Sequence, residues 1–207
     1  MDHDFDIPDI VVGRLPLYLR ALQQMALKGQ VVTSSKELGE RLGISAAQIR
    51  KDLSQFGEFG KQGTGYQIEF LTKQLRNILK VDRVWDMAVV GAGDVGRAIA
   101  RYQGFANRGF RVVAVFDSDP AKIGQTFGDF TIQDSAAILS VIQENQIKIA
   151  MLAVPAQFAQ QMADELVKAG VQAILNYAPV NIIVPPNIQV QYIDPSIHLQ
   201  RMAYYLK

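Results

Sequence analysis

The chain has 207 residues, of which 49% are hydrophobic and 20% charged, a composition typical of a folded globular protein with one or two domains. It contains no cysteine, which excludes disulfides, thiolate metal sites and thiol nucleophiles. Its two histidines, His3 and His198, exclude a multi-histidine metal centre, and we expect no metal. No apolar run reaches the ~18 residues that span a bilayer, and the N-terminus is acidic where a secretory signal is basic. We therefore expect a cytoplasmic protein that has no membrane partner.

The formal net charge of +1 is unevenly distributed along the chain. Residues 10–80 carry eleven Lys and Arg against five Asp and Glu, which gives +6, whereas residues 81–207 carry ten against eleven, which gives −1. Four further Asp lie within residues 1–9. This asymmetry predicts an anionic partner for the N-terminal part.

Helix signals follow one another in this basic part. Apolar residues at helical spacing after Pro16 predict a helix that Gly29 closes. Ser34 and Glu37 have capping-box spacing for a short helix that Gly43 ends, and Ser45 and Gln48 have the same spacing for the next helix. Two capped helices joined by about three residues, with Gly in the turn, predict a helix-turn-helix.

The second of these helices has the pattern of a DNA-reading helix. Ile49, Leu53 and Phe56 share one face, so we expect them in the core, with Asp52 at the core edge as an intramolecular partner. The other sides are polar. There, small Ala47 allows close approach to a major groove, Arg and Lys suit guanine or phosphate, and Gln suits adenine.

A glycine-rich segment, residues 57–68, predicts a β-hairpin that serves as a wing, with Lys61 reaching the minor groove or the backbone of DNA. An amphipathic helix that ends near Val81 follows it and leads into the second part of the chain. The candidate DNA-contacting residues are Ser34, Ser35, Ala47, Gln48, Arg50, Lys51, Ser54, Gln55, Lys61, Gly63 and Gly65.

The second part alternates strand-like and helical runs, which is typical of a parallel sheet. We expect strands at Met87–Val90, Arg111–Phe116, Lys148–Val154, Ala173–Tyr177 and Gln189–Ile193, and helices at Asp94–Ala106, Ala136–Asn145, Gln157–Lys168 and from Asp194-Pro195 onward, where Asp is the N-cap. The stretch before Ala136 reads as irregular. The predicted fold class is α/β: a Rossmann-type parallel sheet domain (82–193) with an N-terminal winged-helix domain (1–81) and a C-terminal helix (194–207).

A glycine motif directly follows the first of these strands and opens a helix: Gly91-Ala92-Gly93-Asp94-Val95-Gly96. In that context the motif predicts a dinucleotide pyrophosphate site. Asp117 ends the second strand 21 residues after Gly96, where a carboxylate binds the adenosine ribose. Because Ser118-Asp119-Pro120 supplies no Arg for a 2′-phosphate, we favour NAD(H) over NADP(H).

Two further strand ends are expected beside the nicotinamide. They are Val154-Pro155 and Asn176-Tyr177-Ala178-Pro179, and the candidate cofactor residues there are Val154, Pro155, Asn176 and Ala178. Because these ends are chiefly apolar, a cationic oxidised ring loses more hydration there than a neutral reduced ring does. We therefore expect NADH to bind better than NAD⁺.

No side chain is marked as a general acid or base for hydride transfer, because neither histidine lies near the expected nicotinamide site. We therefore expect no catalytic residues and no enzyme, with the dinucleotide acting as a signal. Two alternatives stay open. One is an NAD-dependent oxidoreductase with an accessory nucleic-acid-binding domain, and the other is a CoA-binding module of related fold.

Taken together, the motifs resemble those of the bacterial redox-sensing repressor family Rex over essentially the whole chain. The segments that carry the resemblance are Arg14-Leu15-Pro16-Leu17-Tyr18, Ile49-Arg50-Lys51-Asp52-Leu53-Ser54, Phe56-Gly57-Glu58-Phe59-Gly60-Lys61, Gly63-Thr64-Gly65-Tyr66, Gly91–Gly96, Tyr102-Gln103-Gly104-Phe105, Asn176–Pro179 and the Asp194 region.

The resemblance implies a homodimer whose terminal helices, residues 194–207, exchange between subunits. It implies a transcriptional repressor that binds operator DNA, an inverted repeat, when NADH is low and leaves it when NADH binds. It also implies a state-dependent contact among Arg14, Tyr102 and Asp194.

Overall fold

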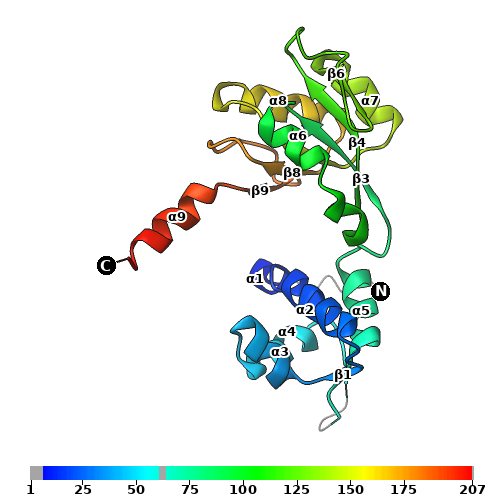
Figure 1. The fold of residues 1–207 in the computed structure, drawn as a ribbon, viewed down its shortest axis with the longest axis vertical. Coiled ribbons are helices and arrows are strands. Elements are labelled where there is room, and N and C mark those ends of the chain that lie inside the picture. Colours follow the sequence, from blue (N-terminus) through cyan, green and yellow to red (C-terminus); the bar gives the residue numbers. More distant parts are fainter. Residues whose placement is uncertain (1–6, 61–63, 207) are drawn as a thin grey trace. The chain divides into compact units, whose positions relative to one another are not determined.

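A computed structural model describes residues 7–60 and 64–206 of the chain. These residues form two compact units that divide between Arg83 and Val84 (Figure 1). Within the described residues, no helix combines the length and the apolar character that crossing a bilayer requires. The same residues contain no group of three or more Asp, Glu or His side chains that could hold a metal ion.

The first unit is mainly helical. Its elements are α1 (Asp9–Val12), α2 (Leu15–Leu27), β1 (Val32–Thr33), α3 (Ser35–Leu42), α4 (Ala46–Ser54), β2 (Tyr66–Gln67) and α5 (Ile68–Ile78). The Ser34 hydroxyl accepts a hydrogen bond from the Glu37 N–H, and Ser45 accepts one from Gln48 in the same way. Gly43 ends α3 in the left-handed conformation, with φ +68°. The predicted pair of capped helices is therefore confirmed as α3 and α4.

The core of this unit lies among α2, α3, α4 and α5. Ile49 and Leu53 of α4 are buried as predicted, whereas Phe56 is only half-buried because α4 ends at Ser54. The other large side chains that are fully buried in this unit include Leu15, Tyr18, Leu22, Met25, Leu38, Ile68, Leu71 and Leu75.

The predicted wing differs from the structure. Strand β2 pairs antiparallel with β1, with Thr33 opposite Tyr66, and residues 57–60 form no strand in the described part of the segment. Ile68, expected in the hairpin, begins α5, because its side chain is buried in the helical core. The candidate residues Lys61 and Gly63 lie outside the described residues.

The second unit contains a seven-stranded sheet in the order β5-β6-β4-β3-β7-β8-β9. Every neighbouring pair is parallel except β5 with β6. Apart from the edge strand β5, this is the strand order of the Rossmann fold. The strands are β3 (Trp85–Val90), β4 (Phe110–Asp117), β5 (Thr126–Phe127), β6 (Phe130–Asp134), β7 (Ile149–Leu152), β8 (Ala173–Asn176) and β9 (Gln189–Tyr192).

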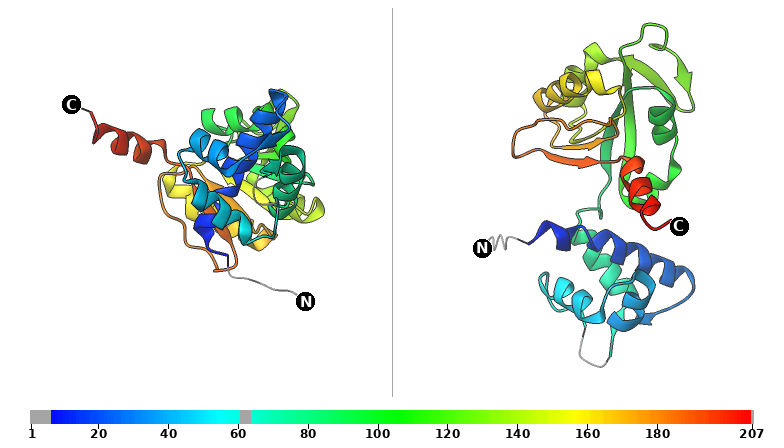
Figure 2. Two further views of the ribbon diagram at one scale, coloured as in Figure 1. Left: turned by 90° about the horizontal axis from the view of Figure 1, so that it is seen from below. Right: turned by 90° about the vertical axis from the view of Figure 1, so that its left-hand side faces the viewer.

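Helices cover both faces of the sheet (Figure 2). The helices are α6 (Asp94–Ala100), α7 (Ile138–Glu144), α8 (Ala156–Ala169) and α9 (Pro195–Ala203), with 3-10 turns η1 (Gln103–Arg108) and η2 (Ser135–Ala137). Along β3, Ala88 and Val90 face the core under α7 and α8, whereas Met87 and Val89 face the core under α6, as the alternation of a strand requires.

Two expectations about this unit were wrong. The helix expected to reach Ala106 ends at Ala100, and Tyr102 is extended, with φ −72° and ψ 101°. The Tyr102 ring occupies the space that a Cβ on Gly104 would need, and Gln103–Arg108 form a 3-10 turn. The stretch before Ala136, predicted to be irregular, contains β5 and β6. The sequence does not reveal these strands because Ile132 is the only fully buried residue of β6, so the segment has no apolar run.

The C-terminal helix begins as predicted. The Asp194 carboxylate accepts a hydrogen bond from the Ser196 N–H at 2.8 Å, and Pro195 occupies the first helical position. Helix α9 has no buried residue, and the side chains of Ile197, Leu199 and Met202 are about 60% exposed.

Candidate dinucleotide pocket and nucleic-acid interface

The glycine loop joins the carboxyl end of β3 to α6. Gly91 has φ +100°, and a Cβ there would collide with the Ala153 carbonyl at the end of β7. A Cβ at Gly96 would collide with the Gly91 carbonyl. At Gly93, by contrast, a Cβ would meet no atom within 4 Å. The fold itself requires Gly91 and Gly96, whereas Gly93 leaves open space for a ligand.

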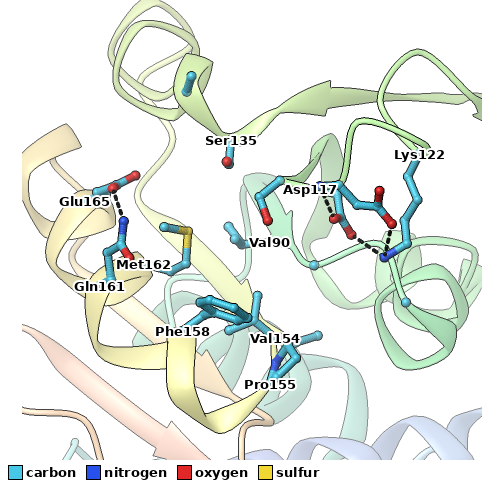
Figure 3. Close-up of a pocket in the computed structure, with 16 residues that line it drawn as sticks. Val90, Asp117, Lys122, Ser135, Val154, Pro155, Phe158, Gln161, Met162 and Glu165 are labelled. Atoms are coloured by element: carbon cyan, nitrogen blue, oxygen red, sulfur yellow. Dashed lines mark hydrogen bonds and ion pairs between the residues drawn. The ribbon is translucent and has the colours of Figure 1, made fainter.

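A cavity of about 620 Å³ lies beside this loop, over the carboxyl ends of β3, β4 and β7 (Figure 3). It is in the size range of small-molecule sites. Figure 3 shows Phe158, Met162 and Glu165 of α8 on one side of the cavity and Asp117 with Lys122 on the other. Of the candidate cofactor residues, the structure brings together Gly91, Gly93, Asp117, Val154 and Pro155.

The Asp117 carboxylate is the polar centre of this site. One oxygen, Oδ2, accepts hydrogen bonds from the Ala92 N–H at 2.7 Å and from Lys122 Nζ at 3.1 Å. The other, Oδ1, accepts from the Asp119 N–H at 2.9 Å. Burial alone would raise the pKa of Asp117, but the two backbone donors and the Lys122 ammonium lower it below its ordinary value. The group is therefore an ionised acceptor at neutral pH.

The remaining candidate cofactor residues do not line the cavity. Asp94 and Val95 are exposed at the start of α6, and Ala92 is buried and donates to Asp117. Asn176 is fully buried: its Oδ1 accepts from the Ala178 N–H, and its Nδ2 donates to the Val180 carbonyl, both at 2.9 Å. Asn176 thus shapes the turn after β8, and a ligand contact there stays a prediction.

The second candidate site is a concave face of the first unit. A hollow of about 810 Å³ is lined by α3, α4 and the wing segment. Arg50 Nη1 donates to Ser35 Oγ at 3.0 Å, which ties α4 to the start of α3. The predicted residues that line this hollow are Ser34, Ser35, Arg50, Ser54 and Gly65, while Ala47, Gln48, Lys51 and Gln55 lie outside the lining. Ala47 and Lys51 are exposed.

On the buried side of α4, Asp52 is fully buried, which confirms its expected intramolecular role. Its carboxylate accepts from Arg14 Nε at 2.6 Å and Nη2 at 2.7 Å, from the Tyr18 hydroxyl at 2.5 Å and from Gln48 Nε2 at 2.6 Å. Burial would raise the pKa of Asp52, but the hydrogen bonds from Arg14, Tyr18 and Gln48 lower it. Sequence reasoning did not find Arg14 and Tyr18 as its partners.

Segments of both units match family models. Residues 82–180 match a model described as "CoA binding domain", and residues 6–54 match one described as "Putative DNA-binding protein N-terminus".

Solved structures with the same architecture include RSP in complex with β-NAD⁺ and operator DNA. The TM-score is 0.91 at 37% identity, over 96% of this chain and 91% of RSP. RSP in complex with β-NADH matches with a TM-score of 0.88 at 34% identity, over 96% and 93% of the two chains. The predicted fold class is confirmed.

Among the curated relatives, the redox-sensing transcriptional repressor Rex of Chloroflexus aurantiacus is 56% identical over 199 residues, which are 96% of this chain and 94% of the relative. Such relatives are named as repressors and not as enzymes, so the oxidoreductase alternative is not favoured. The chain belongs to the family of redox-sensing transcriptional repressors, Rex.

Proposed function

We propose that this chain represses transcription in the cytoplasm by binding an inverted-repeat operator as a homodimer when NADH is low, and that it releases the operator when NADH binds. The observation that carries the proposal is that one chain holds both a dinucleotide-type pocket and a capped helix-turn-helix with an exposed basic helix. Similarity to RSP, solved with operator DNA and with either form of the dinucleotide, supports it.

The proposed binding of the dinucleotide depends on Gly93 and Asp117. Open space at Gly93 lets a pyrophosphate approach the backbone, and the ionised Asp117 carboxylate suits the hydroxyls of an adenosine ribose. Val154, Pro155, Asn176 and Ala178 stay the proposed surroundings of the nicotinamide. The apolar character of Val154, Pro155 and Ala178 favours neutral NADH over cationic NAD⁺. Calorimetric titration with NADH and with NAD⁺ tests this preference. Equal affinities for the two forms would contradict it.

The proposed binding of operator DNA depends on helix α4. Ala47, Arg50, Lys51, Ser54 and Gln55 follow the polar side of this helix, beyond the buried Ile49 and Leu53. The Gln48 amide nitrogen is held by Asp52, so its carbonyl oxygen is the atom left to accept from a base. Ser34, Ser35, Gly65, Lys61 and Gly63 complete the proposed interface.

The proposed homodimer depends on helix α9. Its exposed apolar side chains need a cover, and a second copy of the chain supplies one by exchanging residues 194–207. A two-fold dimer then reads two half-sites separated by whole helical turns. Removing residues 195–207 should yield a monomer in analytical ultracentrifugation, and a truncated chain that stays dimeric would contradict this part of the proposal.

We propose Arg14, Tyr102 and Asp194 as the contact that changes with ligand state. Arg14 uses two of its five N–H donors on Asp52, so its outer edge has donors left for a second carboxylate. The Tyr102 hydroxyl accepts from Arg108 at 2.8 Å and keeps its own hydrogen to donate. NADH shifts the balance between two dimer arrangements only through its different affinity for them.

One alternative ligand has an observation in its favour, since residues 82–180 match a CoA-binding model. CoA lacks a free adenosine ribose diol, so its binding should tolerate loss of the Asp117 carboxylate. Titration of wild type and Asp117→Ala with NADH and with CoA separates the two. The proposal predicts NADH binding that the substitution weakens. CoA binding that survives it, with no NADH binding in wild type, would contradict the proposal.

A further inference from the structure

A lysine stands beside the ribose-binding carboxylate. Lys122 lies in the turn after β4, and its Nζ is 3.1 Å from Asp117 Oδ2 and 3.7 Å from Asp119 Oδ2 (Figure 3). Among the described residues that line the cavity, it is the only Lys or Arg. Residues 118–120, on which the sequence-based preference for NAD(H) depends, do not include this cation.

The acceptor sites of Asp117 are nearly all occupied without a ligand. A carboxylate offers about four lone-pair directions. The Ala92 and Asp119 N–H groups take two of them from fixed backbone positions, and Lys122 takes a third. A ribose diol donates two hydrogen bonds, so Lys122 has to leave Oδ2 when both hydroxyls bind Asp117. Its side chain is 34% exposed on a flexible stem, which permits that movement.

A 2′-phosphate on a ribose bound to Asp117 would lie beside that carboxylate, and the displaced Lys122 ammonium would still be within reach of it on its flexible stem. In the intact site such a phosphate meets the Asp117 and Asp119 carboxylates against one ammonium, which is net repulsion. Without the Asp117 charge, the Lys122 ammonium has only Asp119 nearby and is free to pair with the phosphate.

We propose that Lys122 is a second specificity-determining residue at the adenosine end of the dinucleotide. Its ammonium can bind a 2′-phosphate, and in the intact site Asp117 prevents this by pairing with Lys122 and repelling the phosphate. The intact pair selects the free diol of NAD(H). Removal of the Asp117 charge alone converts the site toward NADP(H), because the required cation is already in place. This inference rests on the proposed function, since it assumes that the cavity binds NADH.

The test compares the full-length wild type with Asp117→Ser, Lys122→Met and the double variant, each titrated calorimetrically with NADH and with NADPH. Asp117→Ser should shift the affinity ratio toward NADPH by about tenfold or more, since relief of a like-charge contact is worth at least that much. Adding Lys122→Met should reverse most of this shift. Lys122→Met alone should widen the wild-type preference for NADH severalfold. The matched control is Lys168→Met, an exposed lysine in the last turn of α8.

Equal NADH-to-NADPH ratios in Asp117→Ser and the double variant would overturn the inference. If circular dichroism shows that Asp117→Ser does not fold, the test is the Lys122→Met variant alone. An NADH-to-NADPH affinity ratio in Lys122→Met equal to that of wild type then overturns the inference. A wild type that binds neither dinucleotide overturns the proposed function together with this inference. A wild type that binds NADH, with ratios unaffected by Lys122, overturns this inference alone.

Discussion

The Arg14 guanidinium and the Asp52 carboxylate form a two-bond ion pair between α2 and the DNA-reading helix α4, with N–O distances of 2.6 and 2.7 Å. Asp52 is fully buried, and 19% of the Arg14 side chain is exposed. The pair fixes α4 against the core and leaves one edge of Arg14 free. The residue proposed to sense the ligand state is thus bonded directly to the helix proposed to read DNA.

Asp52→Asn should destabilise the first unit by about 3 kcal/mol, because it leaves the Arg14 charge without its partner in a mostly buried position. Urea denaturation followed by circular dichroism measures the effect. The control is Asp86→Asn, which breaks the exposed pair with Arg111 and should cost no more than about 1 kcal/mol. Equal effects of the two substitutions would contradict the role assigned to Asp52.

The same pair predicts a pH dependence. The pKa of Asp52 is lower in the folded chain than its ordinary value, so its contribution to the free energy of unfolding is present above about pH 4 and is lost as the pH falls through the folded pKa. The stability difference between wild type and Asp52→Asn should therefore shrink as the pH falls from about 5 to about 2. A difference that stays constant over this range would show that folding does not lower the pKa of Asp52.

Gly93→Val should leave operator binding intact and remove the response to NADH. The new side chain meets no protein atom at its Cβ, so the fold tolerates it, but it fills the space proposed for the pyrophosphate. We expect NADH affinity to fall by about 10- to 100-fold or more, from overpacking against the ligand. Ala98→Val, at an exposed position on helix α6, which Gly93 precedes, should bind NADH as wild type does. Normal NADH affinity in Gly93→Val would place the dinucleotide elsewhere.

Lys51→Ala should weaken operator binding at every sequence tested and lower the slope of log affinity against log salt by about 1 per subunit, as loss of a phosphate contact does. Fluorescence anisotropy at several salt concentrations measures both. Lys73→Ala, an exposed lysine on α5, is the control and should change neither. A slope that Lys51→Ala leaves unaltered would remove Lys51 from the interface.

What the sequence predicts well here is local. The strands β3, β4, β7 and β8 are buried apolar runs, and the caps of α3, α4 and α9 depend on residues two or three positions apart. The glycine loop is equally local. These features depend on neighbouring residues, so they are visible in one sequence.

What the sequence did not predict depends on tertiary contact. Arg14 and Asp52 are 38 positions apart, and no periodic pattern joins them. Lys122 reaches Asp117 only because the turn after β4 folds back. The pairing of β2 with β1 likewise joins segments more than thirty residues apart.

The most direct test of the whole account measures operator affinity with and without saturating NADH, on a duplex selected from random sequences by the full chain. Anisotropy should show that NADH weakens operator binding, and calorimetry should show that the operator weakens NADH binding by the same factor. Operator affinity that NADH leaves unchanged, in a chain that demonstrably binds both ligands, would contradict the account.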